Sequence, residues 1–128
     1  MKETTKNWIK ISDKDLEVSK SLFKNKYYSY AVFMAHQVTE KILKAVIQEI
    51  TNETPLYTHN LALLMKQSSI DFTKDVKENI LRLSPHYFAT RYPEDIIKLT
   101  KQYNLQFTKK FINDVEEIIK WVKKNYLQ

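Results

Sequence analysis

The chain has no glycine in 128 residues, although average usage of about 7% would give roughly nine. Loops that cradle phosphate, dinucleotide-binding turns and tight two-residue hairpins all need backbone conformations that glycine adopts at low cost. The missing glycines therefore exclude P-loop, Rossmann and kinase-type nucleotide sites.

A second missing residue type excludes further kinds of functional site. The sequence contains no cysteine, which excludes disulfides, zinc sites built on cysteine, redox pairs and thiol nucleophiles. The three histidines, His36, His59 and His86, match no recognised spacing of metal ligands. We therefore expect neither a bound metal nor a cofactor.

Size and composition predict one ordinary domain over residues 1–128. Hydrophobic residues make up 43% of the chain and charged residues 28%, as in globular proteins with a closed apolar core. The first ten residues are charged and lack an apolar targeting segment, and no run approaches the ~18 apolar residues of a membrane span. We expect a soluble, cytoplasmic protein that does not contact a membrane.

The balance of charge is basic. Twenty-one basic and 15 acidic residues give a net charge of +6. This suits an anionic partner such as RNA, although a lysine-rich composition gives the same number without one. Only Arg82 and Arg91 are arginines, and arginine binds phosphate with a planar, bidentate geometry that lysine lacks.

Apolar spacing predicts an all-α fold, an up-and-down bundle of four to five helices. The clearest helix runs from Asn104 to about Asn125, where apolar positions alternate spacings of 3 and 4. Residues 27–50 are apolar on most of the helix circumference, which is typical of a central bundle helix. Phe107 and Trp121 lie beside the seam of the long helix, as core residues or as a contact with another subunit.

Further helices are predicted to begin at Ser12, Asn60 and Thr73. Ser12 and Asp15 form a start that resembles a capping box, and Asn60 suits an N-cap. Pro85 should kink or restart the helix that begins at Thr73, because proline lacks a backbone donor.

Three fragments, in order and in register, resemble the hallmarks of the HEPN domain family. They are His-Gln-x-x-Glu-Lys-x-x-Lys-Ala at residues 36–45, His-Asn-Leu at residues 59–61 and Arg-Tyr-Pro at residues 91–93. The resemblance implies an HEPN-like helical bundle that commonly forms a homodimer. Its bacterial and archaeal members often act beside a minimal nucleotidyltransferase in systems of the toxin-antitoxin type.

The resemblance also implies a possible catalytic site. Many HEPN proteins are metal-independent ribonucleases that use an arginine and a histidine separated by about four to six residues, where arginine neutralises phosphate and histidine moves a proton. No histidine follows Arg91, and only three residues separate Arg82 from His86. The candidate catalytic residues are Arg82, His86, Arg91 and Tyr92, with Tyr103 as another phenol. The alternative is a surface arginine beside a kinked helix.

A polar stripe on the predicted central helix supplies candidate ligand-binding residues. Together with the arginine of the third fragment, they are Arg91, His36, Gln37, Lys41 and Lys44. Structural roles compete with this interpretation. His36 suits a hydrogen bond within the bundle, Glu40 and Lys44 form a favourable helix pair, and His59 suits the start of a helix.

Tyr27, Tyr28 and Tyr30 precede the central apolar run. They suit either stacking on nucleic-acid bases or covering the end of the bundle, and we favour the second interpretation.

Three hypotheses for function remain. The favoured one is a dimeric HEPN-type module that binds nucleotide or RNA phosphates through Arg91 and nearby lysines and acts with a nucleotidyltransferase. The second is a metal-independent, toxin-like endoribonuclease with a variant arginine and histidine site. The third is a helical protein-protein interaction module.

Overall fold

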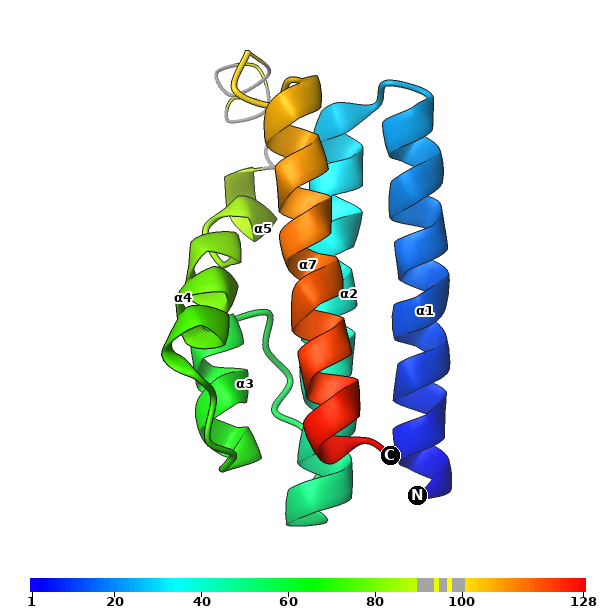
Figure 1. Cartoon of the computed structure of the whole chain (residues 1–128), viewed down its shortest axis with the longest axis vertical. Coiled ribbons are helices and arrows are strands. Elements are labelled where there is room, and N and C mark those ends of the chain that lie inside the picture. Colours follow the sequence, from blue (N-terminus) through cyan, green and yellow to red (C-terminus); the bar gives the residue numbers. More distant parts are fainter. Residues whose placement is uncertain (90–93, 95–96, 98–100) are drawn as a thin grey trace.

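The computed structural model of the chain describes residues 1–89, 94, 97 and 101–128. Its helices are α1 (Glu3–Lys24), α2 (Tyr28–Thr51), α3 (Leu61–Ser68), α4 (Lys74–Leu83), α5 (His86–Ala89) and α7 (Leu105–Tyr126). Figure 1 shows α1 running up, α2 down, α4 and α5 up and α7 down, with the short helices on the side away from α1. No strand occurs among the described residues, so the predicted all-helical bundle is confirmed.

The start of α1 was predicted wrongly. The helix begins at Glu3, nine positions before Ser12. Ser12 is fully buried, and its hydroxyl donates a hydrogen bond of 3.0 Å to the carbonyl of Val38 on α2. Ser19 is also buried and donates to the carbonyl of Ala31 at 2.7 Å. Because two small side chains seven positions apart share one helix face, these serines join α1 to α2 and do not cap α1.

α2 forms the centre of the bundle, and its bounds are close to those of the helix predicted over residues 27–50. Most of its apolar residues are buried, and several, including Val32, Ile42 and Val46, are fully inaccessible. They pack against α1 and α7. On α7, the side chains of Phe107 and Trp121 are partly buried against the same core. This packing supports the interpretation of Phe107 and Trp121 as core residues.

In the described part of the chain, three backbone positions adopt the left-handed conformation that usually selects glycine. They are Lys26, Asn52 and Ser69, with φ angles of 65°, 60° and 59°. At the end of α1 the amide of Lys26 donates to the carbonyl of Phe23 and the amide of Tyr27 to that of Leu22. This is the bond pattern of a Schellman motif. The chain thus closes its helices without glycine, at an energetic cost in the backbone.

The predicted cap at Asn60 and the break at Pro85 are confirmed, unlike the start predicted at Ser12. The side chains of Asn60, Thr73 and Asn104 accept hydrogen bonds from backbone amides at the starts of α3, α4 and α7. α4 ends at Leu83 and the short α5 begins at His86, directly after Pro85. Among the described helices, none is long and apolar enough to cross a membrane.

Candidate functional site

The short helix α5 directs two adjacent side chains to different neighbours. The ring of His86 contacts α7 and its preceding segment, where it meets Tyr103 and Phe111 at centroid distances of 5.7 and 5.3 Å. The ring of Tyr87 contacts His36 of α2 at 5.3 Å and stacks on His59 at 4.2 Å. All three histidines of the chain therefore gather around α5, because Pro85 restarts the helix at this place.

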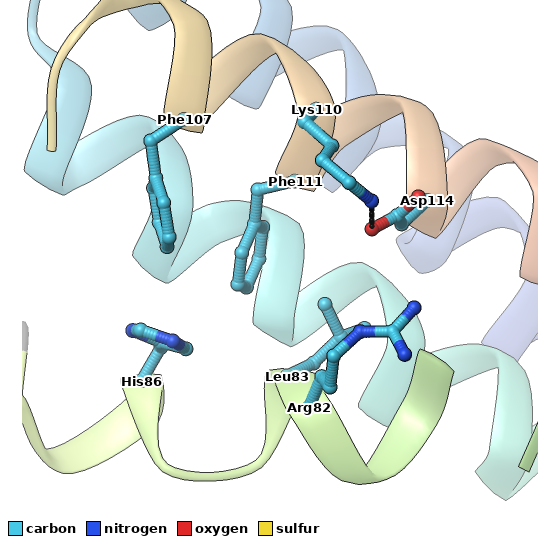
Figure 2. A pocket seen from close by; sticks show the side chains of 7 residues that line it. All are labelled: Arg82, Leu83, His86, Phe107, Lys110, Phe111 and Asp114. Atoms are coloured by element: carbon cyan, nitrogen blue, oxygen red, sulfur yellow. Dashed lines mark hydrogen bonds and ion pairs between the residues drawn. The ribbon is translucent and has the colours of Figure 1, made fainter. Parts of the chain in front are cut away.

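A pocket of about 220 Å³ lies between α4, α5 and α7. It is lined by Arg82, Leu83, His86, Phe107, Lys110, Phe111 and Asp114. Figure 2 shows His86 at one end and the guanidinium of Arg82 at the other, with Leu83 and Phe111 between them. Lys110 forms an ion pair of 2.9 Å with Asp114 near the arginine. The pocket thus has an apolar floor and charged groups at one rim.

His86 is held as a neutral imidazole. Its Nδ1 lies 2.8 Å from the hydroxyl of Tyr103, and the ring is half-buried among aromatic side chains. Burial lowers the pKa of His86 below its usual value, because desolvation disfavours the charged form. In the tautomer in which Nδ1–H donates to the phenol oxygen, the neutral ring can accept a proton at Nε2.

The two predicted catalytic residues of α4 and α5 line one pocket but do not converge. Arg82 is exposed and donates from Nη2 to Oδ1 of Asn79, on its own helix. Its guanidinium lies at the rim, away from His86 (Figure 2). Arg91 and Tyr92, the other two candidate catalytic residues, lie outside the described residues.

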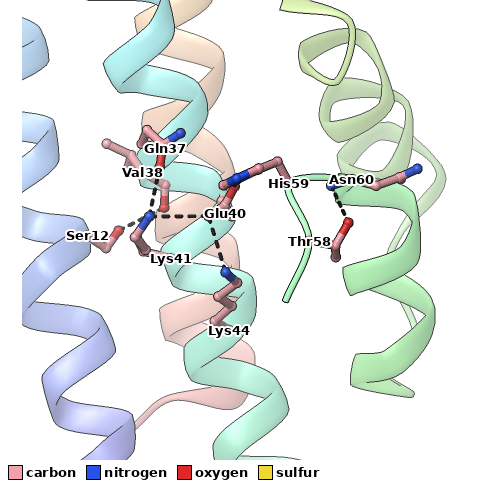
Figure 3. A network of polar contacts seen from close by, with 9 residues as sticks. All are labelled: Ser12, Gln37, Val38, Glu40, Lys41, Lys44, Thr58, His59 and Asn60. Carbon is pink, nitrogen blue, oxygen red and sulfur yellow. Dashed lines mark hydrogen bonds and ion pairs between the residues drawn. The ribbon is translucent and has the colours of Figure 1, made fainter. Parts of the chain in front are cut away.

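The polar stripe of α2 forms a compact ion cluster around Glu40, which is only 1% exposed. Oε1 of Glu40 lies 2.7 Å from Nδ1 of His59, and Oε2 accepts from Lys41 at 3.2 Å and Lys44 at 3.3 Å. Figure 3 shows His59 reaching this carboxylate from the loop before α3. Burial acts to raise the pKa of Glu40, but the hydrogen bond to His59 and the two lysines together lower it. Glu40 is therefore ionised and fully partnered.

The candidate ligand residues on α2 interact mainly with one another. Gln37 accepts a hydrogen bond of 2.8 Å from Lys41, and Lys44 lies 5.5 Å above the ring of Trp8. The structure thus brings Gln37, Lys41 and Lys44 together, as the sequence suggests, but around a carboxylate. The pairing of Glu40 with His59 was missed, although both belong to fragments that carry the family resemblance.

His36 does not make the hydrogen bond expected of it. The residue is fully buried, and neither ring nitrogen has a hydrogen-bond partner among the residues that the structure describes. Burial lowers the pKa of His36 to about 4; nearby Glu40 opposes this shift, whereas His59, His86 and Lys41 add to it. His36 is thus a neutral ring packed beside Tyr87, and it is inaccessible to an outside ligand. Within the described residues, no group of three or more acidic or histidine side chains suits a metal ion.

The bundle and its motif residues define a protein of the HEPN class. The chain matches the HEPN domain over residues 5–125 and belongs to that family. The Glu40 cluster is thus built from the fragments that carry the resemblance. Glu40 and Lys44 belong to the first fragment, and His59 belongs to the second.

Several known proteins are similar to this one. A Methanocaldococcus jannaschii protein named "Putative toxin MJ1304" is 27% identical, with 92% of this chain and 85% of that protein covered. The crystal structure of ST0689, described as an archaeal HEPN homologue, has a TM-score of 0.77 at 25% identity, and 98% of this chain and 99% of that chain are covered. The crystal structure of TT1696 from Thermus thermophilus shares the fold, with a TM-score of 0.82 at 18% identity over 96% of this chain and 98% of that one.

Proposed function

We propose that this HEPN-type module binds nucleotide or RNA phosphates on the face formed by α4, α5 and α7. The pocket that holds His86, Arg82 and Lys110 above an aromatic floor is the observation that carries the proposal. Aromatic side chains stack on bases of any identity, and arginine and lysine bind phosphate. A volume of about 220 Å³ lies below the usual ~300–1,000 Å³ of sites for drug-sized ligands and suits a single base.

The charge of this region supports an anionic ligand. From Lys101 to Asn113 the sequence has three lysines and no acidic residue, and the pocket's one acidic lining residue, Asp114, pairs with Lys110. Arg91 remains a proposed phosphate contact, since it follows the end of α5 by two positions in the sequence. We do not propose phosphate binding for Lys41 and Lys44 of the Glu40 cluster, because they already neutralise a buried carboxylate.

The biological setting we propose is a system of the toxin-antitoxin type. In it, a homodimer of this chain acts with a minimal nucleotidyltransferase. Membership of the HEPN family supports this setting, as does the toxin name of the Methanocaldococcus jannaschii relative. Exposed leucines on the outer short helices, Leu63 and Leu81, offer apolar surface for a protein contact.

A metal-independent ribonuclease is the second candidate. The hydrogen bond between His86 and Tyr103 favours it in the tautomer in which Nδ1–H donates to the phenol oxygen, because Nε2 can then take a proton from a 2′-hydroxyl. The position of Arg82 at the far rim of the pocket argues against a shared phosphate (Figure 2). Binding is therefore the function that the geometry supports better.

Titration of labelled single-stranded RNA and of a labelled mononucleotide, followed by fluorescence anisotropy, tests the proposal. Arg82→Ala combined with Lys110→Ala should weaken binding of both ligands by about tenfold or more, since charge-assisted phosphate contacts are lost. Arg82→Lys should restore little of the loss. Lys14→Ala, which removes an exposed lysine on α1, is the matched control. Equal affinities for all variants would disprove binding at this pocket.

The same titration tests the region after α5. Arg91→Ala should weaken binding, and Arg91→Lys should recover little of it, because the planar guanidinium is lost. If all three versions bind equally, Arg91 is not part of the site.

A further inference from the structure

The end of the bundle where α2 begins exposes two tyrosine rings. Tyr27 and Tyr30 are each 58% exposed, whereas Tyr28 packs against Phe23 at a centroid distance of 5.7 Å. Tyr28 therefore covers the bundle end, as the sequence suggested, but its two neighbours do not. A hollow of about 230 Å³ lies here, lined by Lys26, Tyr27, Tyr28, Ser29, Tyr30 and Tyr103.

This end of the molecule is basic. From Val18 to Thr39 the sequence has three lysines and no acidic residue. Lys24 and Lys26 are exposed, and in the described part of the chain neither takes part in an ion pair. Exposed rings beside unneutralised ammonium groups match the chemistry of a single-stranded nucleic acid, whose bases stack and whose phosphates are anionic.

Lys26 occupies a position that its backbone disfavours. Its φ of 65° lies in the left-handed region, where a side chain with a Cβ atom is less stable than glycine. Lys26 also lines the hollow together with Tyr27 and Tyr30.

Tyr103 connects this hollow to the pocket described above. Its ring lines the hollow, its hydroxyl lies 2.8 Å from Nδ1 of His86, and its ring contacts Phe107 at 5.5 Å. His86 and Phe107 in turn line the pocket of the proposed function. Tyr103 thus lines one recess and contacts two residues that line the other.

We propose that Tyr27, Tyr30 and Lys26 form a second binding site, which holds the bases and backbone of single-stranded RNA beyond the nucleotide bound near His86. This rests on the proposed function, since it extends the same RNA along the surface. Tyr27 and Tyr30 stack on bases, and Lys26 contacts phosphate. The ligand is therefore a strand of several nucleotides, and a mononucleotide fills only the first site.

The test compares a labelled oligouridylate, long enough to cross both recesses, with labelled UMP. The double variant Tyr27→Leu/Tyr30→Leu should bind the oligouridylate about tenfold or more weakly, because stacking on two rings is lost. Its affinity for UMP should equal that of the unchanged protein. Tyr27→Phe/Tyr30→Phe keeps both rings and should keep oligouridylate binding. Tyr57→Leu, which replaces a fully exposed tyrosine of the loop before α3, is the control.

Lys26→Gly separates binding from folding. Glycine relieves the left-handed backbone, so the melting temperature should rise by about 3–5 °C, while oligouridylate affinity falls. Ser69→Gly makes the same backbone change on α3 and should leave RNA affinity unchanged. A more stable Lys26→Gly protein that binds oligouridylate as well as the original would remove Lys26 from the site.

The outcomes distinguish the two proposals. Weaker oligouridylate binding by the tyrosine variant, with UMP binding retained, supports the second site. If the Arg82/Lys110 variant loses affinity but the tyrosine variant does not, the second site is disproved and the first stands. If the tyrosine variant instead changes only the molecular mass in light scattering, the rings belong to a subunit contact and the inference is overturned.

Discussion

Nδ1 of His59 lies 2.7 Å from Oε1 of Glu40, although nineteen positions separate the two residues. The His59 ring also stacks on Tyr87, with the two planes 16° apart. Glu40 thereby fixes the loop before α3, and the loop supports α5. Because α5 also carries His86, the buried carboxylate sets the position of one wall of the proposed nucleotide pocket.

We expect Glu40→Gln to lower the free energy of unfolding by about 2–4 kcal/mol, because Lys41 and Lys44 lose a buried carboxylate. Chemical denaturation at neutral pH measures the change. Glu116→Gln is the matched control: this carboxylate is 39% exposed and pairs with Lys20, and its loss should cost no more than about 1 kcal/mol. Equal effects of the two substitutions would contradict the role given to the Glu40 cluster.

The stability of the protein should fall between about pH 6.5 and pH 4 because of His36. Its pKa is 6.5 in an unfolded chain and about 4 in the fold, so only the unfolded state takes up a proton as the pH falls through this range. The titratable neighbours Glu40, Lys41, His59 and His86 already enter this value. The lowered pKa of His86 acts in the same direction.

His36→Leu should therefore become more stable relative to the original protein at acid pH. The advantage should grow by about 2 kcal/mol between about pH 7.5 and pH 5, as measured by denaturant titrations at both values. Parallel pH profiles for the two proteins would show that His36 is not held neutral.

Ser69→Gly should stabilise the protein by about 0.5–1 kcal/mol, because Ser69 ends α3 in the left-handed conformation that glycine adopts freely. The adjacent Ser68→Gly should do the opposite by about 1 kcal/mol or more, since Ser68 is helical, buried and bonded to the carbonyl of Met65. Thermal unfolding measures both. Two changes of the same sign would contradict the assigned backbone conformations.

The isolated protein should cleave single-stranded RNA only weakly, and His86→Ala should leave that trace unchanged, because Arg82 and His86 lie at opposite ends of their pocket. Incubation of labelled RNA, with and without EDTA, measures cleavage. Rapid cleavage that resists EDTA and drops by roughly a hundredfold in His86→Ala, the scale of a lost general base, would identify a ribonuclease instead.

In solution we expect a homodimer with twice the chain mass of 15.3 kDa. Leu63→Lys combined with Leu81→Lys should shift it toward the monomer, since both leucines are exposed on the outer helices. Light scattering at micromolar concentration measures the mass. A monomer mass for the unchanged protein would rule out the dimer.

Most of the helices were predictable from the sequence because their ends have local chemical causes. Asn104 caps α7, Asn60 caps α3, and Pro85 separates α4 from α5. The start of α1 was not predictable in this way, because Ser12 has the composition of a cap but is buried against α2. A buried serine and a capping serine differ only in their tertiary surroundings.

The candidate site was less predictable, since its contacts join distant parts of the chain. The i,i+4 pair of Glu40 and Lys44 follows from helix geometry. No spacing rule places His59 on the same carboxylate, or predicts that His36 lacks a hydrogen bond. The sequence names Arg82 and His86 as a candidate catalytic pair, and both line one pocket, but their separation across it depends on the packing of α4 and α5 against α7.

The two chain ends lie close together at the bottom of the bundle in Figure 1, whereas the first turn of α2 is at the top. Since α1 spans 22 residues, this separates them by about 33 Å. A dye, affinity tag or surface tether attached at either end therefore remains a full helix length from the hollow that is lined by Tyr27 and Tyr30. Energy transfer from a terminal dye to a labelled RNA would then report in which direction the strand runs along the protein.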